Sequence, residues 1–123
     1  MDAARLRPGS GRWLVVPPLG YLDFVALESS AALVLTDSGG VQEETTALGV
    51  PCLTLRENTE RPITLSQGTN TLAGTARASI LAAYAAFRRE PRAGKVPPYW
   101  DGRAATRVVE VLERAFDLAG ADA

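Results

Sequence analysis

The chain has 123 residues, 46% of them hydrophobic and 22% charged, so its composition is that of a globular domain with one modest core. Its 13 basic and 14 acidic residues give a net charge of −1 without a dense Lys/Arg block, which argues against a nucleic-acid partner. Cys52 is the single cysteine, so an intrachain disulfide is excluded. No apolar run reaches the length of a membrane span, and no apolar signal core follows the basic N-terminal residues, so we expect a cytoplasmic protein without a membrane partner.

The first half of the chain predicts two strands that alternate with two helices. Trp13 to Leu19, "WLVVPPL", has the apolar character of a strand that ends at its two prolines, and the apolar-rich segment Tyr21 to Ala31 has the length of a helix. Ala32 to Thr36, "ALVLT", is a continuous apolar run of the kind that is buried on both faces of a parallel sheet. Apolar residues at helical spacing then predict a helix from Gly39 to Leu48, with Gly49 at its C-terminal cap.

The second half continues the alternation. Cys52 to Leu55, "CLTL", predicts a third strand, and the polar loop Arg56 to Pro62 separates it from a short candidate fourth strand, Thr69 to Gly74. Two helices close the chain, the first with Thr75 and the second with Asp101 as the candidate N-cap. The proline-rich link between these helices is predicted to cross the surface in an extended form.

Strands that alternate with helices through short turns predict an α/β fold with right-handed crossovers. Three to four strands are visible, whereas a complete doubly wound nucleotide-binding unit has about five or six, so we predict a partial Rossmann-like parallel sheet flanked by helices, the later half of a larger domain. The predicted division is a flexible leader at 1–12, a nucleotide-binding α/β portion at 13–90, and a crossing link with a C-terminal helix at 91–123. The predicted core contains Val41, Thr45, Leu48, Cys52 and Leu53, with Cys52 as a small buried hydrophobe rather than a nucleophile.

Candidate ligand-binding residues begin where the second predicted strand ends, in "TDSGGVQEE". Ser38, Gly39 and Gly40 lie between a strand end and a helix start, where free N–H groups and the helix dipole attract a phosphate and glycines let it approach. A tight turn with a Ser or Asp N-cap explains the same residues equally well. Glu43 and Glu44 are adjacent and therefore point in different directions on a helix; they compensate the helix dipole, or one of them accepts the hydroxyls of a ribose.

Arg61 is the candidate cation. Pro62 biases Arg61 away from helical geometry, which leaves it extended in the loop after the third predicted strand. Its planar guanidinium suits a diphosphate, and a solvated surface arginine is the ordinary alternative.

The run "TDSGGVQEETTALGVPCLTLRENTERP", residues 36–62, resembles the signature of the C-terminal domain of non-hydrolysing UDP-N-acetylglucosamine 2-epimerases. The flanking "LGYLDF" and "GTNTLAG" fit the same family in order and spacing, and the resemblance covers roughly residues 13–115. It implies an architecture similar to that of two-domain GT-B glycosyltransferases, with the active site between two Rossmann-like domains. It also implies interconversion of UDP-GlcNAc and UDP-ManNAc by elimination and re-addition of UDP, with no dissociable cofactor and no metal.

The same resemblance assigns candidate roles around a bound UDP. The diphosphate would be held by Ser38, Gly39, Gly40 and Arg61, the ribose hydroxyls by Glu44, and the uracil by Phe24 together with the backbone near Leu19. Simple core packing is the structural alternative for Phe24.

The resemblance places the acid and base groups of the family on carboxylates of the N-terminal domain and on a histidine, and this chain contains no histidine. Because proton abstraction at C2 needs a base across the cleft, we assign no catalytic residue here and expect a UDP half-site that does not epimerise by itself. The expected partners are UDP or UDP-GlcNAc and a complementary N-terminal epimerase domain or a second copy of the chain, since an unpaired sheet edge favours association. The alternatives are a non-catalytic module that binds UDP or a UDP-sugar, and a fragment of a hydrolysing epimerase or GT-B glycosyltransferase.

Overall fold

The computed structural model of the chain describes residues 14–91 and 94–116. Its centre is a parallel sheet of three short strands, β1 (Val34–Thr36), β2 (Cys52–Thr54) and β3 (Asn70–Leu72), in the order β1-β2-β3. In this register Thr36 lies beside Thr54, and Thr54 beside Leu72, so the carboxyl ends of the three strands meet at one edge of the sheet. The predicted fold class, a partial parallel α/β sheet, is confirmed.

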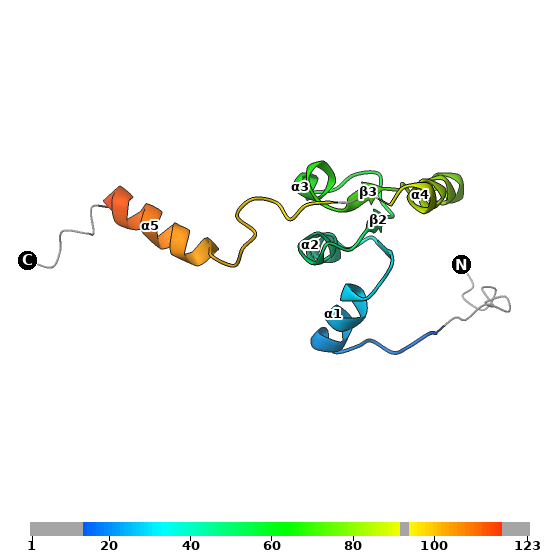
Figure 1. Ribbon diagram of the computed structural model, residues 1–123, viewed down its shortest axis with the longest axis horizontal. Coiled ribbons are helices and arrows are strands. Elements are labelled where there is room, and N and C mark those ends of the chain that lie inside the picture. The colour runs from blue at the N-terminus through cyan, green and yellow to red at the C-terminus, as the bar shows by residue number, and fades with distance from the viewer. Residues whose placement is uncertain (1–13, 92–93, 117–123) are drawn as a thin grey trace, which may run out of the picture.

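Within the described residues, five helices surround or extend from this sheet. Figure 1 shows α2 and α3 on one face of the sheet and α4 on the other, as right-handed crossovers between neighbouring parallel strands require. In the same view α1 lies beside α2, and α5 stands apart at the end of the link. The helices are α1 (Tyr21–Ser29), α2 (Gly39–Leu48), α3 (Pro62–Ser66), α4 (Arg77–Arg89) and α5 (Ala104–Phe116). In the described part of the chain, no helix is long and apolar enough to span a bilayer.

The core between α2 and the sheet contains an unusual share of polar side chains. Thr45, Cys52 and Leu53 are buried, as predicted. The two largest fully buried side chains, however, are the amides of Gln42 and Asn70. Buried amides are stable only where their donors and acceptors find partners, so these two side chains are expected to specify how α2, β3 and the loops fit together.

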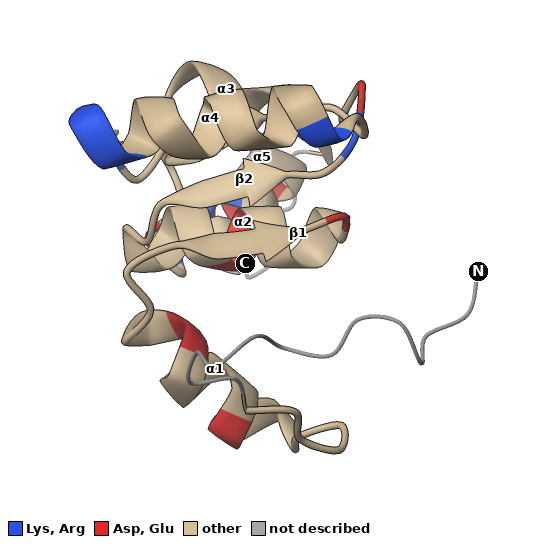
Figure 2. Ribbon diagram, turned by 90° about the vertical axis from the view of Figure 1, so that its right-hand side faces the viewer, with Lys and Arg blue, Asp and Glu red and all other residues tan. Residues whose placement is uncertain are grey.

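Two expectations about strands were wrong. Trp13 lies outside the described residues, and residues 14–19 form no strand. Val15 is 86% exposed, and the segment lies below the sheet, next to α1, in the view of Figure 2. A strand needs a neighbour for its backbone hydrogen bonds, and this segment also carries two prolines. The second error concerns β1, which is an edge strand beside β2 with a half-exposed Leu35 rather than a strand buried on both faces.

Other differences are local. Leu48 is exposed in the last turn of α2, not in the core, while Gly49 forms the predicted left-handed cap with a φ of 73°. Ala76, not Thr75, is the N-cap of α4, because Glu57 binds both the backbone N–H and the hydroxyl of Thr75 at 2.9 Å. These two hydrogen bonds, the backbone one first, lower the pKa of Glu57 below its ordinary value.

The link and the last helix also differ in detail from the predictions. α5 begins at Ala104, three residues beyond Asp101, whose carboxylate accepts from the N–H of Arg103 and pairs with Arg107 at 2.6 Å. The link starts close to the sheet, because the N–H of Lys95 donates to the carbonyl of Gln67 at 2.9 Å. The proposed leader at 1–12 lies outside the described residues.

Candidate functional site

The N-terminus of α2 lies directly after the carboxyl end of β1. Ser38 is the N-cap, with an extended backbone, and its Oγ accepts from the N–H of Val41 at 3.5 Å. The N–H of Ser38 donates to Thr36 Oγ1 at 3.0 Å, which fixes the turn between strand and helix. The N-cap interpretation of Ser38 is therefore confirmed. Helix geometry leaves the next N–H groups, those of Gly39 and Gly40, without an intrahelical acceptor, so they point outward beyond the helix end.

Neither glycine is required by the backbone or by packing in the described structure. Glycines with positive φ occur at Gly49, Gly74 and Gly102, not at Gly39 or Gly40. A Cβ at Gly39 would meet nothing within 4 Å, and one at Gly40 would come no closer than 3.8 Å, to Ser38 Oγ. Because Cα–Cβ bonds on a helix tilt toward its N-terminus, the missing side chains keep the space in front of α2 open. We call Ser38, Gly39 and Gly40 the anion cradle, because an open helix N-terminus with free N–H groups is what an anion requires.

Arg61 lies beside this helix and is not a freely solvated arginine. Pro62 begins α3, so Arg61 is held just before it with a non-helical ψ of 58°. Arg61 Nε lies 2.9 Å from Glu43 Oε1, with its N–H unaligned, so the contact is an ion pair rather than a good hydrogen bond. Both side chains are about two-fifths exposed, and such a pair contributes at most about 1 kcal/mol to stability. Its structural consequence is that the guanidinium stays next to the first turns of α2.

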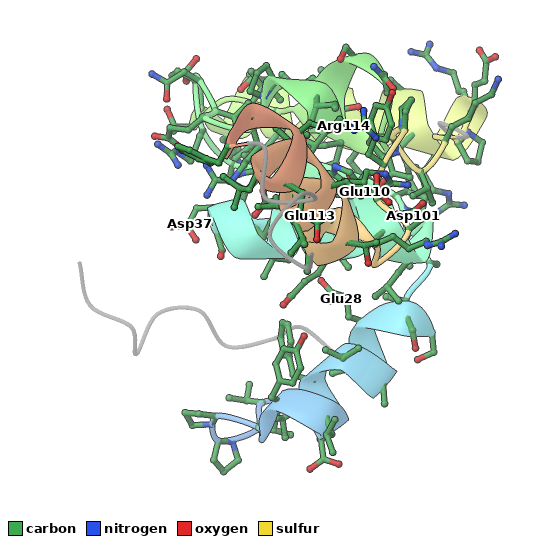
Figure 3. The ribbon with its side chains drawn as sticks, turned by 90° about the vertical axis from the view of Figure 1, so that its left-hand side faces the viewer. Glu28, Asp37, Asp101, Glu110, Glu113 and Arg114 are labelled. Atoms are coloured by element: carbon green, nitrogen blue, oxygen red, sulfur yellow. The ribbon has the colours of Figure 1, made fainter. Side chains whose placement is uncertain are left out.

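Glu44 points in a different direction from Glu43, toward α1, because adjacent residues of a helix are about 100° apart around its axis. Its charge adds to the main effect, burial, in raising the pKa of Glu28 on α1. Glu28 is 3% exposed, and neither of its carboxylate oxygens has a hydrogen-bond partner among the described residues. Figure 3 shows Glu28 where α1 meets the rest of the fold, and Asp37 at the outer edge beside the anion cradle. Glu44 therefore has a second carboxyl group nearby, that of Glu28. Arg61 is the cation that an ion pair with Glu43 holds against α2 at this site.

Phe24 and Leu19 lie on the α1 side of the site. Phe24 is 37% exposed on α1, which contacts α2, and Leu19 is exposed just before α1. The ring of Phe24 is therefore not fully packed into the core, which was the structural alternative for this residue. The ring leaves an apolar surface that a flat base could cover, but its role beside uracil is still a prediction.

Three residues around the site were not predicted. The sequence suggests only dipole compensation or a ribose contact for Glu43, hides Glu28 inside an apolar segment, and indicates no role for Gln42. An acidic residue within "VALESSAAL" was the available signal for Glu28. No local pattern could have shown which of two adjacent glutamates faces Arg61, because the loop that carries Arg61 arrives from beyond β2.

Hollows elsewhere do not belong to this site. One of about 460 Å³ is lined by Leu33, Pro51 and Thr69, each next to the amino end of a strand, and by residues of α4. Ligands of open α/β sheets bind at the carboxyl ends of the strands, at the opposite edge. Among the described residues, no cluster of three or more His, Cys, Asp or Glu side chains could hold a metal ion.

Comparison with known proteins identifies the family. Residues 3–113 match the family model described as UDP-N-acetylglucosamine 2-epimerase. The chain belongs to this family. It is 45% identical over 98 residues to the UDP-N-acetylglucosamine 2-epimerase of Methanocaldococcus jannaschii, a match that covers 80% of this chain and 26% of the relative. The corresponding Escherichia coli enzyme is 38% identical over 105 residues, with 81% and 28% covered.

Solved structures of epimerases share the same fold over this segment. The structure of the Neisseria meningitidis enzyme bound to UDP-GlcNAc superimposes with a TM-score of 0.71 at 38% identity and covers 80% of this chain and 28% of that one. That of the M. jannaschii enzyme in complex with UDP-GlcNAc and UDP gives 0.69 at 44% identity, with 80% and 27% covered. The chain thus spans about a quarter to a third of the length of these family members and forms part of their GT-B fold.

Proposed function

We propose that this epimerase chain binds the UDP moiety of UDP-N-acetylglucosamine and supplies the UDP-binding portion of a 2-epimerase active site. The observation that carries the proposal is the anion cradle at the open N-terminus of α2, with Arg61 ion-paired to Glu43 on the same helix. Two structural neighbours that share this segment bind UDP-GlcNAc, which supports the same ligand here.

In this proposal the diphosphate oxygens accept from the N–H groups of Gly39 and Gly40 and from the hydroxyl of Ser38. Ser38 Oγ acts as acceptor in its cap bond, so its own proton stays available for a phosphate oxygen. Arg61 neutralises the diphosphate with its planar fork of donors. Glu44 accepts the ribose hydroxyls, and the exposed surface of Phe24 with the backbone near Leu19 bounds the base. The proposed nucleotide-binding portion is 13–90, followed by the link and last helix at 91–123.

Epimerisation needs groups that this chain does not supply. The chain has no histidine, and of the carboxylates near the anion cradle Glu43 is paired with Arg61 and Asp37 lies at the outer edge. We infer that the proton at C2 of the sugar is removed and replaced by groups of another domain that faces the UDP site. We propose that the 123-residue chain binds UDP without epimerising the sugar and that a complementary N-terminal epimerase domain completes the reaction.

Calorimetric titration of the 123-residue chain with UDP, UMP and uridine tests the binding proposal. We expect saturable UDP binding that weakens for UMP and further for uridine, because the phosphates carry the contacts. Arg61→Ala and Glu44→Ala should each weaken UDP binding by at least about tenfold, or about 1.4 kcal/mol. Arg56→Ala is the matched control, because Arg56 is in the same loop and pairs with Glu60 instead.

Equal UDP affinity in Arg61→Ala, Arg56→Ala and the parent chain would remove Arg61 from the site. A folded parent chain that binds no UDP would refute the function itself. The partner proposal has its own assay: mixing with the N-terminal domain of an epimerase relative should restore conversion of UDP-GlcNAc to UDP-ManNAc, and each component alone should be inactive.

A further inference from the structure

The backbone of Arg61 is held on both sides by threonine hydroxyls. Thr59 Oγ1 accepts from the N–H of Arg61 at 3.0 Å. Thr64 Oγ1 donates to the carbonyl of Arg61 at 2.7 Å, and the Thr64 N–H donates to the same oxygen at 3.0 Å. Both backbone polar groups of Arg61 are thus fixed within the turn that leads into α3.

The two hydroxyls are in turn bonded to buried amides. Gln42 Oε1 accepts from Thr59 Oγ1 at 2.5 Å and from Asn70 Nδ2 at 3.2 Å. Asn70 Nδ2 also donates to Thr64 Oγ1 at 3.0 Å, while its Oδ1 accepts from Thr54 Oγ1 at 2.6 Å. Gln42 and Asn70 are completely buried, so the network that meets Arg61 at both ends is closed to solvent at its centre.

The hydrogen bonds at the two threonine hydroxyls have one consistent set of directions. Thr59 gives its one proton to Gln42, so it can only accept from Arg61. Thr64 gives its proton to the Arg61 carbonyl, so it can only accept from Asn70. Moving either threonine would leave further buried polar atoms unpaired beside Gln42 Nε2, which has no partner among the described residues, so the network favours the observed geometry.

The network also connects Arg61 to the helix that carries the anion cradle. Gln42 lies one turn from Ser38 on α2, and Asn70 begins β3, so the Arg61 turn is tied to both. Glu43 holds the guanidinium end of the same residue. The backbone and the side chain of Arg61 are therefore fixed to one helix by two successive residues, Gln42 and Glu43.

We propose that Gln42 and Thr59 are positioning residues that hold Arg61 at the distance from the anion cradle at which its guanidinium binds a nucleoside diphosphate. The inference rests on the proposed function for its ligand. The hydrogen-bonded placement of Arg61 is a property of the chain itself and is tested without a ligand.

Thr59 is the residue to vary, because it is only partly buried and its substitution leaves the core in place. Thr59→Val keeps the shape and removes the hydroxyl, and Thr59→Ser restores it. Without UDP, hydrogen exchange of the Arg61 amide should be at least about tenfold faster in Thr59→Val and close to the parent rate in Thr59→Ser, since the exchange of an amide rises when its acceptor is lost. An unchanged exchange rate in Thr59→Val overturns the inference.

Titration with UDP gives the second readout. Thr59→Val should weaken UDP binding about three- to tenfold, Thr59→Ser should recover it, and Thr59→Val should have no further effect in an Arg61→Ala background. A loss of the same size in that background would show that Thr59 does not act through Arg61 and would overturn the positioning role. If the parent chain binds no UDP, the proposed function fails, while the exchange experiment still decides whether the Thr59 hydroxyl fixes the Arg61 backbone.

Discussion

Replacing Gly39 or Gly40 of the anion cradle by alanine should have two effects: the fold becomes more stable, and the affinity for UDP falls. Gly39 has a helical backbone and free space of 4 Å around an added Cβ, so Gly39→Ala removes the entropy cost of glycine without a clash. This stabilises the fold by about 0.5–1 kcal/mol. For a small domain this raises the thermal midpoint by about 4–8 °C per kcal/mol. Gly40→Ala should behave alike, because its Cβ comes no closer than 3.8 Å to Ser38 Oγ.

The same methyl groups would stand where the phosphate is proposed to bind. Because helical Cα–Cβ bonds tilt toward the N-terminus, both project into the space in front of α2, and that of Gly40 lies beside the Ser38 hydroxyl. We expect UDP affinity to fall by about tenfold, or about 1.4 kcal/mol, in Gly40→Ala. Thermal unfolding and calorimetric titration of the same samples measure the two effects independently.

Gly49→Ala is the matched control, because Gly49 ends the same helix with a φ of 73°. There alanine should destabilise by about 1–2 kcal/mol, since a left-handed backbone crowds Cβ, and UDP affinity should not change. If Gly40→Ala is more stable and binds UDP as well as the parent chain, the glycines do not serve a phosphate. If Gly39→Ala is less stable, the geometric argument about free space is wrong.

Three further outcomes follow from buried groups. Burial and the charge of Glu44 raise the pKa of Glu28, so the folded chain keeps a proton that the unfolded chain releases. The free energy of unfolding should therefore fall by about 1.4 kcal/mol per pH unit as the pH rises from about 4.5 to the raised pKa. Urea titrations should show this slope removed in Glu28→Gln and kept in Glu113→Gln; identical slopes in both would contradict a buried Glu28. Gly68→Ala should lower stability by about 1–3 kcal/mol, because the added Cβ would lie 2.5 Å from Thr46 Oγ1 and 2.7 Å from the Thr64 carbonyl oxygen. An unchanged urea midpoint would show that the structure relaxes around this contact without cost. Burial raises the pKa of the Cys52 thiol, so a thiol reagent should modify it only on unfolding, and rapid modification of the folded chain would place Cys52 at the surface.

The sequence alone determined the features that depend on neighbouring residues. Ser38 as N-cap, Gly49 as the left-handed end of α2 and a non-helical Arg61 before Pro62 are confirmed, because each is set by the conformational limits of one residue type, whereas helix α3 after Pro62 was not predicted. The parallel α/β order and the family resemblance of residues 36–62 also required only the order of residues along the chain, and both are confirmed.

The tertiary structure decided what depends on partners distant in the chain. The apolar run at 14–19 resembled a strand but has no neighbouring strand in the described chain, and a strand exists only with one. Arg61 pairs with Glu43, not Glu44, because adjacent residues of α2 point in different directions and the loop reaches only one of them. Gln42 bonds Asn70 across 28 positions of sequence. Local periodicity describes one helix or strand at a time, so it cannot show which faces meet; the packing of α2 against β3 and the Arg61 loop sets the geometry of this site.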